Sequence, residues 1–170
     1  MEQTNTTPEG LIESAHGIEA VLANLYKNFP HLPKTARKVL ADIAPWLALI
    51  SGLFGLLSLM TYGAIMSSMF ALGGVIMILG ITTLVLGIIG SVLQLLAFNP
   101  LRARERKGWN FLFYSALIGA LSVILSFSTS MMTLSTYGRA SGLSAFLSAT
   151  IGYLIAGWLL FEIRKQFRNK

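Results

Sequence analysis

Residues Ile43–Leu101 read IAPWLALISGLFGLLSLMTYGAIMSSMFALGGVIMILGITTLVLGIIGSVLQLLAFNPL, and this stretch carries no charged side chain. One helical crossing of the hydrocarbon core of a bilayer takes about 20 mostly apolar residues. The stretch is therefore long enough for two crossings, and we expect a turn near its middle. It is bounded by Asp42 on one side and by the basic segment Arg102–Lys107 on the other. We expect the chain to leave the membrane at that basic segment.

The turn inside this stretch is predicted from its few helix-breaking residues. The candidates are Tyr62-Gly63 and Ser67-Ser68. They place the first span at about Ile43–Met60 and the second at about Phe70–Phe98, which is long and which we expect to be tilted. We expect Asn99-Pro100 to end the second span, because the residue before a proline is disfavoured in a helix.

A second uncharged run, Gly108–Gly138, is longer than one crossing requires. Its excess is the segment Ser126–Thr136, which is rich in Ser and Thr. We place the third span at Trp109–Phe127 and expect the polar segment to form an outer loop or to line a crevice. After the cation Arg139, the fourth span is predicted at Gly142–Phe161.

The composition bounds the class of protein. Charged residues make up 12% of the 170 residues, against about 25% in a typical soluble domain. The length allows one domain. Cysteine is absent, which excludes disulfides, thiolate catalysis and Cys-ligated metals. The beginning of the chain is polar and mixed in charge, so we expect no cleaved signal peptide and an uncleaved first span.

The basic residues predict the orientation in the membrane. All but one of the 13 Lys and Arg residues fall in three clusters, at 27–38, 102–107 and 164–170, and the exception is Arg139. With four spans the three clusters face one compartment, which the positive-inside rule makes the cytoplasm. Aromatic residues at the predicted span ends favour the same orientation: Trp46, Trp109 and Trp158 at the inner ends, and Tyr62 and Tyr137 at the outer ends. We therefore expect a multi-pass membrane protein with both termini in the cytoplasm.

Cations beside the spans are predicted to contact anionic lipid headgroups. They are Lys34, Arg37, Lys38, Arg102, Arg104, Arg106 and Lys107. The first three belong to a predicted short helix from Lys34 to about Ala44, separate from the span that follows. The net charge of +6 is also typical of nucleic-acid binding proteins, but clusters placed beside apolar spans indicate a membrane surface. We expect no nucleic-acid partner.

The N-terminal segment predicts an amphipathic helix. Thr7-Pro8-Glu9 is typical of a helix start, and Pro30 is expected to end the helix. Apolar residues recur every three or four positions, which places them on one face: Leu11, Ala15, Ile18, Leu22, Leu25 and Phe29. The helix can lie on the membrane, pack on the cytoplasmic face of the protein or pair with another helix. Its polar face is mainly acidic and should be repelled by anionic lipid, so we favour packing against protein. The predicted partner interface is Leu11, Ile18, Leu22, Leu25 and Phe29.

Small residues recur in every predicted span, and close approach of backbones at such residues holds membrane helices together. The predicted helix-packing positions are Gly73, Gly80, Gly87, Gly119 and Gly152, with Gln94 as a residue that forms an interhelical hydrogen bond. In the fourth span the repeat is Ser148, Gly152 and Ala156. Packing within one chain accounts for most of this pattern, and contacts between copies are the alternative.

Residues that carry chemistry are sparse. The middle third of each predicted span has no ionisable side chain, whereas transport and proton relays usually use one. His16 and His31 lack metal-ligand spacing, and the chain has neither a paired-carboxylate set within the spans nor a glycine-rich phosphate loop. We therefore predict no enzyme activity, no cofactor and no metal. Arg139 is a candidate contact for an anionic ligand, and a solvated loop residue is the alternative.

The stretch LRARERKGWNFLFY (Leu101–Tyr114), together with APWLALI (Ala44–Ile50), resembles small multi-span inner-membrane proteins of bacteria. The resemblance covers most of Lys34–Lys170. It implies a bacterial inner-membrane protein without implying an activity, and it assigns no functional residue.

The predicted fold is all-α: an integral membrane four-helix bundle of two hairpins, with an N-terminal cytoplasmic amphipathic helix. Its parts are the helix and basic segment at 1–42, the four-span domain at 43–163 and a basic cytoplasmic tail at 164–170. We predict a protein that acts by association, as a homo-oligomer or as an accessory subunit of a membrane-protein partner. The alternative is a small channel or transporter that uses the Ser/Thr-rich segment and Arg139.

Overall fold

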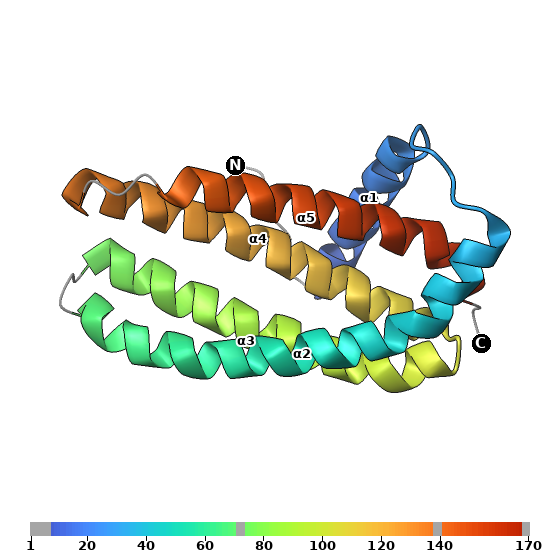
Figure 1. The fold of residues 1–170 in the computed structure, drawn as a ribbon, viewed down its shortest axis with the longest axis horizontal. Helices are drawn as coiled ribbons and strands as arrows, with labels where there is room; N and C mark the ends of the chain where they lie inside the picture. Colours follow the sequence, from blue (N-terminus) through green and yellow to red (C-terminus); the bar gives the residue numbers. More distant parts are fainter. Residues whose placement is uncertain (1–7, 71–73, 138–140, 168–170) are drawn as a thin grey trace. The chain divides into compact units, whose positions relative to one another are not determined.

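The computed structural model describes residues 8–70, 74–137 and 141–167, with side chains for 17–61, 74–131, 143–144 and 146–167. These residues form helices, and the described ranges contain no strand, so the all-α prediction is confirmed (Figure 1). The elements are α1 (Pro8–Tyr26), α2 (Lys34–Phe70), α3 (Gly74–Arg102), α4 (Arg106–Tyr137), α5 (Ser141–Ile163) and the short 3-10 helix η1 (Arg164–Gln166).

The chain forms two compact units, residues 1–32 and residues 33–170. The first contains α1, which ends at Tyr26 rather than running up to Pro30. A turn follows, in which the Phe29 N–H donates to the Tyr26 carbonyl at 3.2 Å and the two rings meet edge to face. Phe29 precedes a proline and is therefore disfavoured in a helix. This residue of the predicted interface consequently lies beyond the helix that was expected to carry it.

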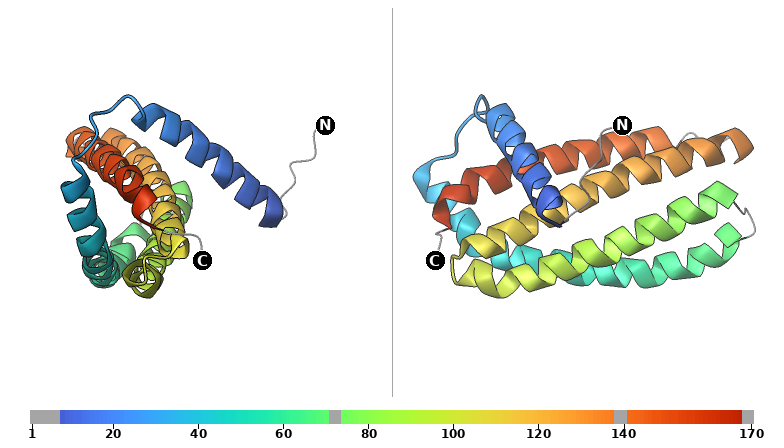
Figure 2. Two further views of the ribbon diagram at one scale, coloured as in Figure 1. Left: turned by 90° about the vertical axis from the view of Figure 1, so that its right-hand side faces the viewer. Right: turned by 180° about the vertical axis from the view of Figure 1, so that it is seen from behind.

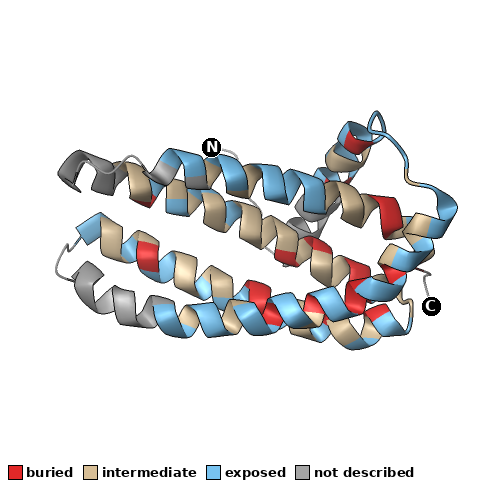
Figure 3. Ribbon diagram, viewed as in Figure 1, coloured by how far each residue is buried: buried red, intermediate tan, exposed pale blue. Residues whose placement is uncertain are grey.

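Within the described residues, four helices of the second unit are long and apolar enough to cross a membrane. The qualifying segments are Lys34–Thr61, Gly74–Arg102, Arg106–Met131 and Phe146–Gln166. Only 11% to 22% of the most apolar window in each is buried against the rest of the protein, and the exposed faces of the helices are plain in Figure 3. Such continuous apolar surface needs a cover, and the hydrocarbon core of a bilayer supplies one for helices of this length. The prediction of a multi-pass membrane protein is confirmed at this level.

Two boundaries predicted for α2 are wrong. The basic segment from Lys34 to Ala44 is not a separate helix, because α2 continues from it through Pro45 into the apolar segment. Proline removes one backbone hydrogen bond, a loss that membrane helices accommodate. The turn expected at Tyr62-Gly63 or Ser67-Ser68 is also absent, because α2 stays helical to Phe70. The next helix begins at Gly74, whose φ of 59° is in the left-handed region that glycine adopts readily.

The other two breaks predicted inside the apolar runs are wrong as well. Helix α3 passes through Asn99-Pro100 and ends at Arg102. Helix α4 includes all of Ser126–Thr136, so this segment is not an outer loop. Ser128 and Thr129 show why, since each hydroxyl donates at 3.0 Å to the carbonyl four residues earlier in the helix. In an apolar surrounding this bond satisfies the side chain within the helix that carries it.

The helices of the second unit lie beside one another in chain order. Helix α3 packs along both α2 and α4, α4 packs against α5, and α2 meets α5 over a short stretch. The two views of Figure 2 show α2 beside α3 and α4 beside α5. The start of α2, the α3–α4 turn and the end of α5 lie at one end of this unit (Figure 1). We call it the basic end, because residues 34–38, 102–107 and 164–165 gather there.

The core of this unit is concentrated at the basic end. Leu101 and Trp109 are the largest side chains with no exposed surface among the described residues. The other buried apolar residues among the described part of this unit are Ala41, Ala44, Ala48, Ala97, Phe113, Ile163 and Phe167. In Figure 3 the buried positions cluster toward this end. The basic end therefore holds the helices together most firmly.

Candidate functional site

The turn between α3 and α4 has a defined backbone geometry. The Arg104 N–H donates to the Leu101 carbonyl at 3.0 Å, and the Glu105 N–H donates to the Pro100 carbonyl at 2.8 Å. These two bonds are the Schellman arrangement that closes a helix, with Arg104 at the left-handed position (φ 58°). An arginine there is strained where a glycine would not be. The Arg104 backbone thus adopts a conformation that is unfavourable for a residue with a side chain.

That side chain forms an ion pair with α2. Arg104 Nη2 donates to Asp42 Oδ1, which ties the α3–α4 turn to the first third of α2. A second ion pair joins α2 to α5, with Arg37 Nε 2.6 Å from Glu162 Oε1. The Glu162 side chain is 8% exposed, so this pair is shielded from solvent more than a surface pair is. Both pairs lie at the basic end and hold α2 against the other elements.

Trp109 lies at the start of α4 and joins it to α5. Its indole Nε1 donates to the Leu160 carbonyl at 2.8 Å. Its ring stacks on Phe113 with a centroid separation of 5.2 Å and meets Phe161 edge-on at 5.6 Å. A buried tryptophan usually needs a partner for its N–H, and here the carbonyl of a neighbouring helix fills that role.

Two guanidinium groups lie over the same indole ring. The Arg106 group is 4.3 Å from the ring centroid, and the Arg164 group is 5.3 Å away. Cation–π attraction is strongest on tryptophan and increases where the pair is removed from water. Trp109 is therefore a point where α4, the end of α5 and two of the basic clusters meet.

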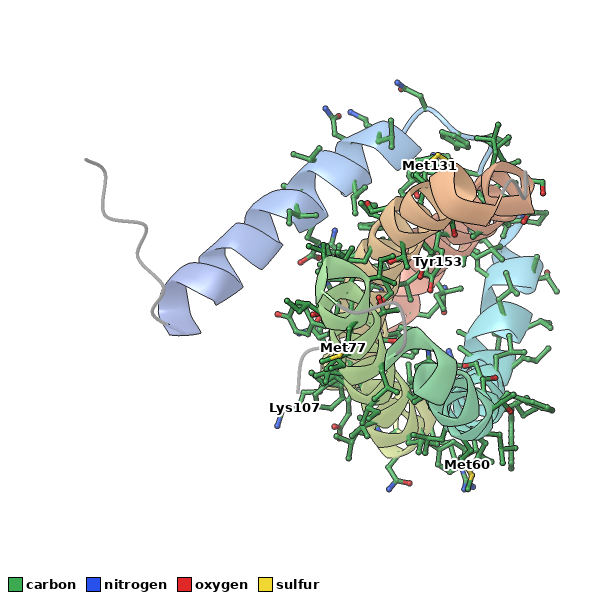
Figure 4. All side chains as sticks on the ribbon, turned by 90° about the vertical axis from the view of Figure 1, so that its left-hand side faces the viewer. Met60, Met77, Lys107, Met131 and Tyr153 are labelled. Atoms are coloured by element: carbon green, nitrogen blue, oxygen red, sulfur yellow. The ribbon has the colours of Figure 1, made fainter. Side chains whose placement is uncertain are left out.

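The structure divides the predicted lipid-contact residues into two groups. Arg37 and Arg104 are engaged in ion pairs, and Arg106 lies over Trp109. The exposed members are Lys34, Lys38, Arg102 and Lys107. Lys107 projects outward from the helices in Figure 4. These four are the predicted lipid-contact residues that stay exposed, and the Arg102 guanidinium lies 5.8 Å from the centroid of the Phe98 ring.

Glycines position the helices against one another. A Cβ on Gly52 would lie 3.0 Å from the Leu95 side chain, and one on Gly87 would lie 3.0 Å from Leu59. Gly119 is covered by the Tyr153 ring, so a Cβ there would clash with the phenol. Gly80 is buried in α3, whereas Gly73 lies outside the described residues. Gly152 differs from these positions, because nothing lies within 4 Å of a Cβ placed on it.

A polar link connects α3 and α4 within the spans. Gln94 Nε2 donates to Ser115 Oγ at 3.0 Å, and the Ser115 hydroxyl donates in turn to the Gly90 carbonyl at 3.2 Å. Hydrogen bonds between membrane helices contribute about 0.6–2 kcal/mol each. This link needs no bound ligand to satisfy the Gln94 N–H group.

A pocket of about 280 Å³ lies between α4 and α5. Its walls are Gly119, Ser122, Val123, Ser126, Phe127 and Ser130 from α4, and Phe146, Ala149 and Tyr153 from α5. The polar segment at 126–136, predicted to form a loop or to line a crevice, thus contributes Ser126 and Ser130 to a pocket wall. Repetition of serine every four residues on α4 was a sequence signal for this wall.

Other predicted positions lie outside what the structure describes. Arg139 is one of them, and the side chain of Leu11 is another. Among the described residues, no three His, Cys, Asp or Glu side chains come close enough to hold a metal ion. The chain matches no protein-family model, no curated protein and no solved structure.

Proposed function

We propose that this chain is a bacterial inner-membrane protein that acts by association, with no catalysis of its own. Its four long helices form one bundle of two hairpins, and copies of the bundle pair in the membrane through α5. A helical partner of another kind, for which this chain is an accessory subunit, remains the alternative form of the same function. The single observation that supports pairing is the outward-facing stripe of small residues on α5.

This α5 stripe consists of Ser148, Gly152 and Ala156, which are four residues apart and all exposed. The glycines of α2, α3 and α4 described above contact neighbouring helices, but Gly152 has open space around it. Membrane helices approach closely where small residues repeat every four positions. Two α5 helices related by twofold symmetry would present the same stripe to each other. The stripe therefore fits a second copy of the chain.

The proposed orientation places the basic end in the cytoplasm. The exposed cations there would meet the anionic headgroups of the inner leaflet, at about 1 kcal/mol each. Both termini then face the cytoplasm. In the first unit, Ile18 and Leu25 are exposed on α1, which suits an amphipathic helix that contacts a soluble or membrane-protein partner.

Cross-linking of single cysteines tests the pairing, because the chain has no cysteine of its own. We expect Gly152→Cys to form a disulfide-linked dimer in membranes under mild oxidation. Leu57→Cys, on an exposed face of α2, is the matched control and should stay monomeric. Gly152→Leu should abolish energy transfer between labelled copies, since a bulky side chain separates the stripes. Equal cross-linking at positions 152 and 57, or none at 152, contradicts pairing through α5.

Impermeant labelling tests the orientation. In intact cells, we expect Lys107→Cys to resist a membrane-impermeant maleimide and to react only after the membrane is opened. Arg139→Cys should react in intact cells, because positions 107 and 139 lie beyond opposite ends of the third span. Labelling of position 107 from outside the cell contradicts the proposed topology.

The channel or transporter alternative has one supporting observation, the serine-lined pocket between α4 and α5. Arg139, the other residue that this alternative invokes, is outside the described residues. The pocket has a simpler use than a pathway, which is to hold a molecule.

A further inference from the structure

The pocket between α4 and α5 has the size of a small-molecule site. Its volume is about 280 Å³, and a cavity of about 150 Å³ is enough to bind benzene. Tyr153 is drawn near the middle of the end-on view in Figure 4, and its side chain stays 39% exposed, so the pocket is open to its surroundings. There is room for a molecule of two fused rings.

The pocket walls are rich in aromatic rings. Phe127 of α4 and Phe146 of α5 face each other with a centroid separation of 4.2 Å and an interplanar angle of 33°. The phenol of Tyr153 lies over Gly119, which has no side chain to exclude it. Rings of this kind favour a flat, apolar guest, which they contact through offset or edge-on packing.

Hydroxyl groups give the pocket its polarity. Ser122 and Ser130 donate their protons to helix carbonyls at 3.0 Å and 2.9 Å. A hydroxyl that donates still has an oxygen that can accept. The side chains of Ser126 and Tyr153 line the pocket without a hydrogen bond to another described residue. Each can donate to a guest, and in hydrocarbon no bulk water competes for that role.

Charge decides between classes of guest. None of the nine residues that line the pocket is charged, so an ion that entered would lose its hydration without gaining a counter-charge. A purely apolar chain would leave the hydroxyls of Ser126 and Tyr153 without partners. The lining therefore selects a neutral molecule that combines rings with groups that both donate and accept hydrogen bonds.

We propose that this pocket binds a neutral, membrane-soluble aromatic alcohol of the phenol or quinol class. The ring packs against the Phe127–Phe146 pair and the phenol of Tyr153. Its hydroxyl accepts from Tyr153 or Ser126 and donates to Ser122. The guest enters from the bilayer, and its binding does not depend on whether copies of the chain pair.

The experiment uses 2-naphthol as the probe and the full chain in lipid nanodiscs. We expect saturable binding, measured by equilibrium dialysis against empty nanodiscs. Ser126→Leu fills the pocket and should weaken binding at least about tenfold. Ser128→Leu is the matched control, because Ser128 lies two residues away on the same helix and does not line the pocket. It should bind as the native chain does. Equal affinity in the two variants, or no saturable binding to the native chain, would overturn the proposal.

A smaller substitution guards against misfolding of the filled variant. Tyr153→Phe removes one hydroxyl and should weaken 2-naphthol binding about two- to tenfold, the range expected for one neutral hydrogen bond. The same variant should bind 2-methylnaphthalene, which lacks an oxygen, as the native chain does. If Tyr153→Phe changes both affinities equally, or neither, the assigned role of the hydroxyl is wrong.

Discussion

Gly108→Ala is expected to disrupt the basic end of the protein. A Cβ at position 108 would lie 2.6 Å from the Leu101 backbone nitrogen and 2.9 Å from the Pro100 carbonyl carbon. Those atoms belong to the closed turn between α3 and α4 and cannot move away without opening it. Overpacking of this kind costs about 3 kcal/mol. We expect the variant to unfold in detergent well below the temperature of the native chain, as followed by circular dichroism.

Gly152→Ala is the matched control for this substitution. It has the same chemistry, lies in another helix and meets nothing of its own chain within 4 Å. Alanine also has a better helix propensity than glycine, by about 1 kcal/mol. The control should therefore be as stable as the native chain or more so. Equal unfolding temperatures for the two variants would refute the close approach of α4 to the end of α3.

Trp109→Ala is expected to have an effect of similar size. The substitution removes a side chain with no exposed surface, its stacking on Phe113 and its hydrogen bond to the Leu160 carbonyl. Truncation of a buried aromatic residue costs about 3–5 kcal/mol. The variant should lose contact between α4 and α5 at the basic end. We expect a lower unfolding temperature and faster proteolysis of the segment that follows Ile163.

Two further variants separate packing from the hydrogen bond. Trp109→Phe keeps a ring but loses the indole N–H, and we expect a smaller loss of about 1 kcal/mol. Trp46→Ala is the control at an exposed tryptophan, since Trp46 is 53% exposed and meets Phe98 edge-on. If Trp46→Ala destabilises the protein as much as Trp109→Ala, then Trp109 has no special place in the core.

The membrane helices could be predicted from the absence of charge, but their ends could not. Ser, Gly and Pro were read as helix breakers at 62–63, 67–68 and 99–100, as they are in water. Within an apolar helix a serine hydroxyl bonds to the preceding turn, as Ser58 does to the Phe54 carbonyl at 2.8 Å. The glycine that begins the next helix is Gly74, and the neighbouring Gly73-Gly74 pair was the turn signal that was overlooked.

The ion pairs at the basic end could not be predicted from sequence. Asp42 is in α2 and Arg104 is in the α3–α4 turn, while Arg37 and Glu162 come from two different helices. The partners are far apart in the sequence. The local charge pattern therefore predicted only a lipid contact for Arg37 and Arg104. The crevice was one of two alternatives predicted for the Ser/Thr-rich segment at 126–136, and that prediction was made from composition. Which stripe of small residues faces inward depends on how helices pack, and only the structure separates Gly119 from Gly152.

The concentration of the core at the basic end has a mechanical consequence. Ion pairs, the closed turn and Trp109 all fix the helix spacing at one leaflet. When bilayer thickness changes, membrane helices respond by altering their tilt. Here the helices are held together at the basic end. A change of tilt therefore alters the distance between the helices chiefly at the other end. A change in bilayer thickness that affects both leaflets equally thus moves the helices mainly at one end of the protein.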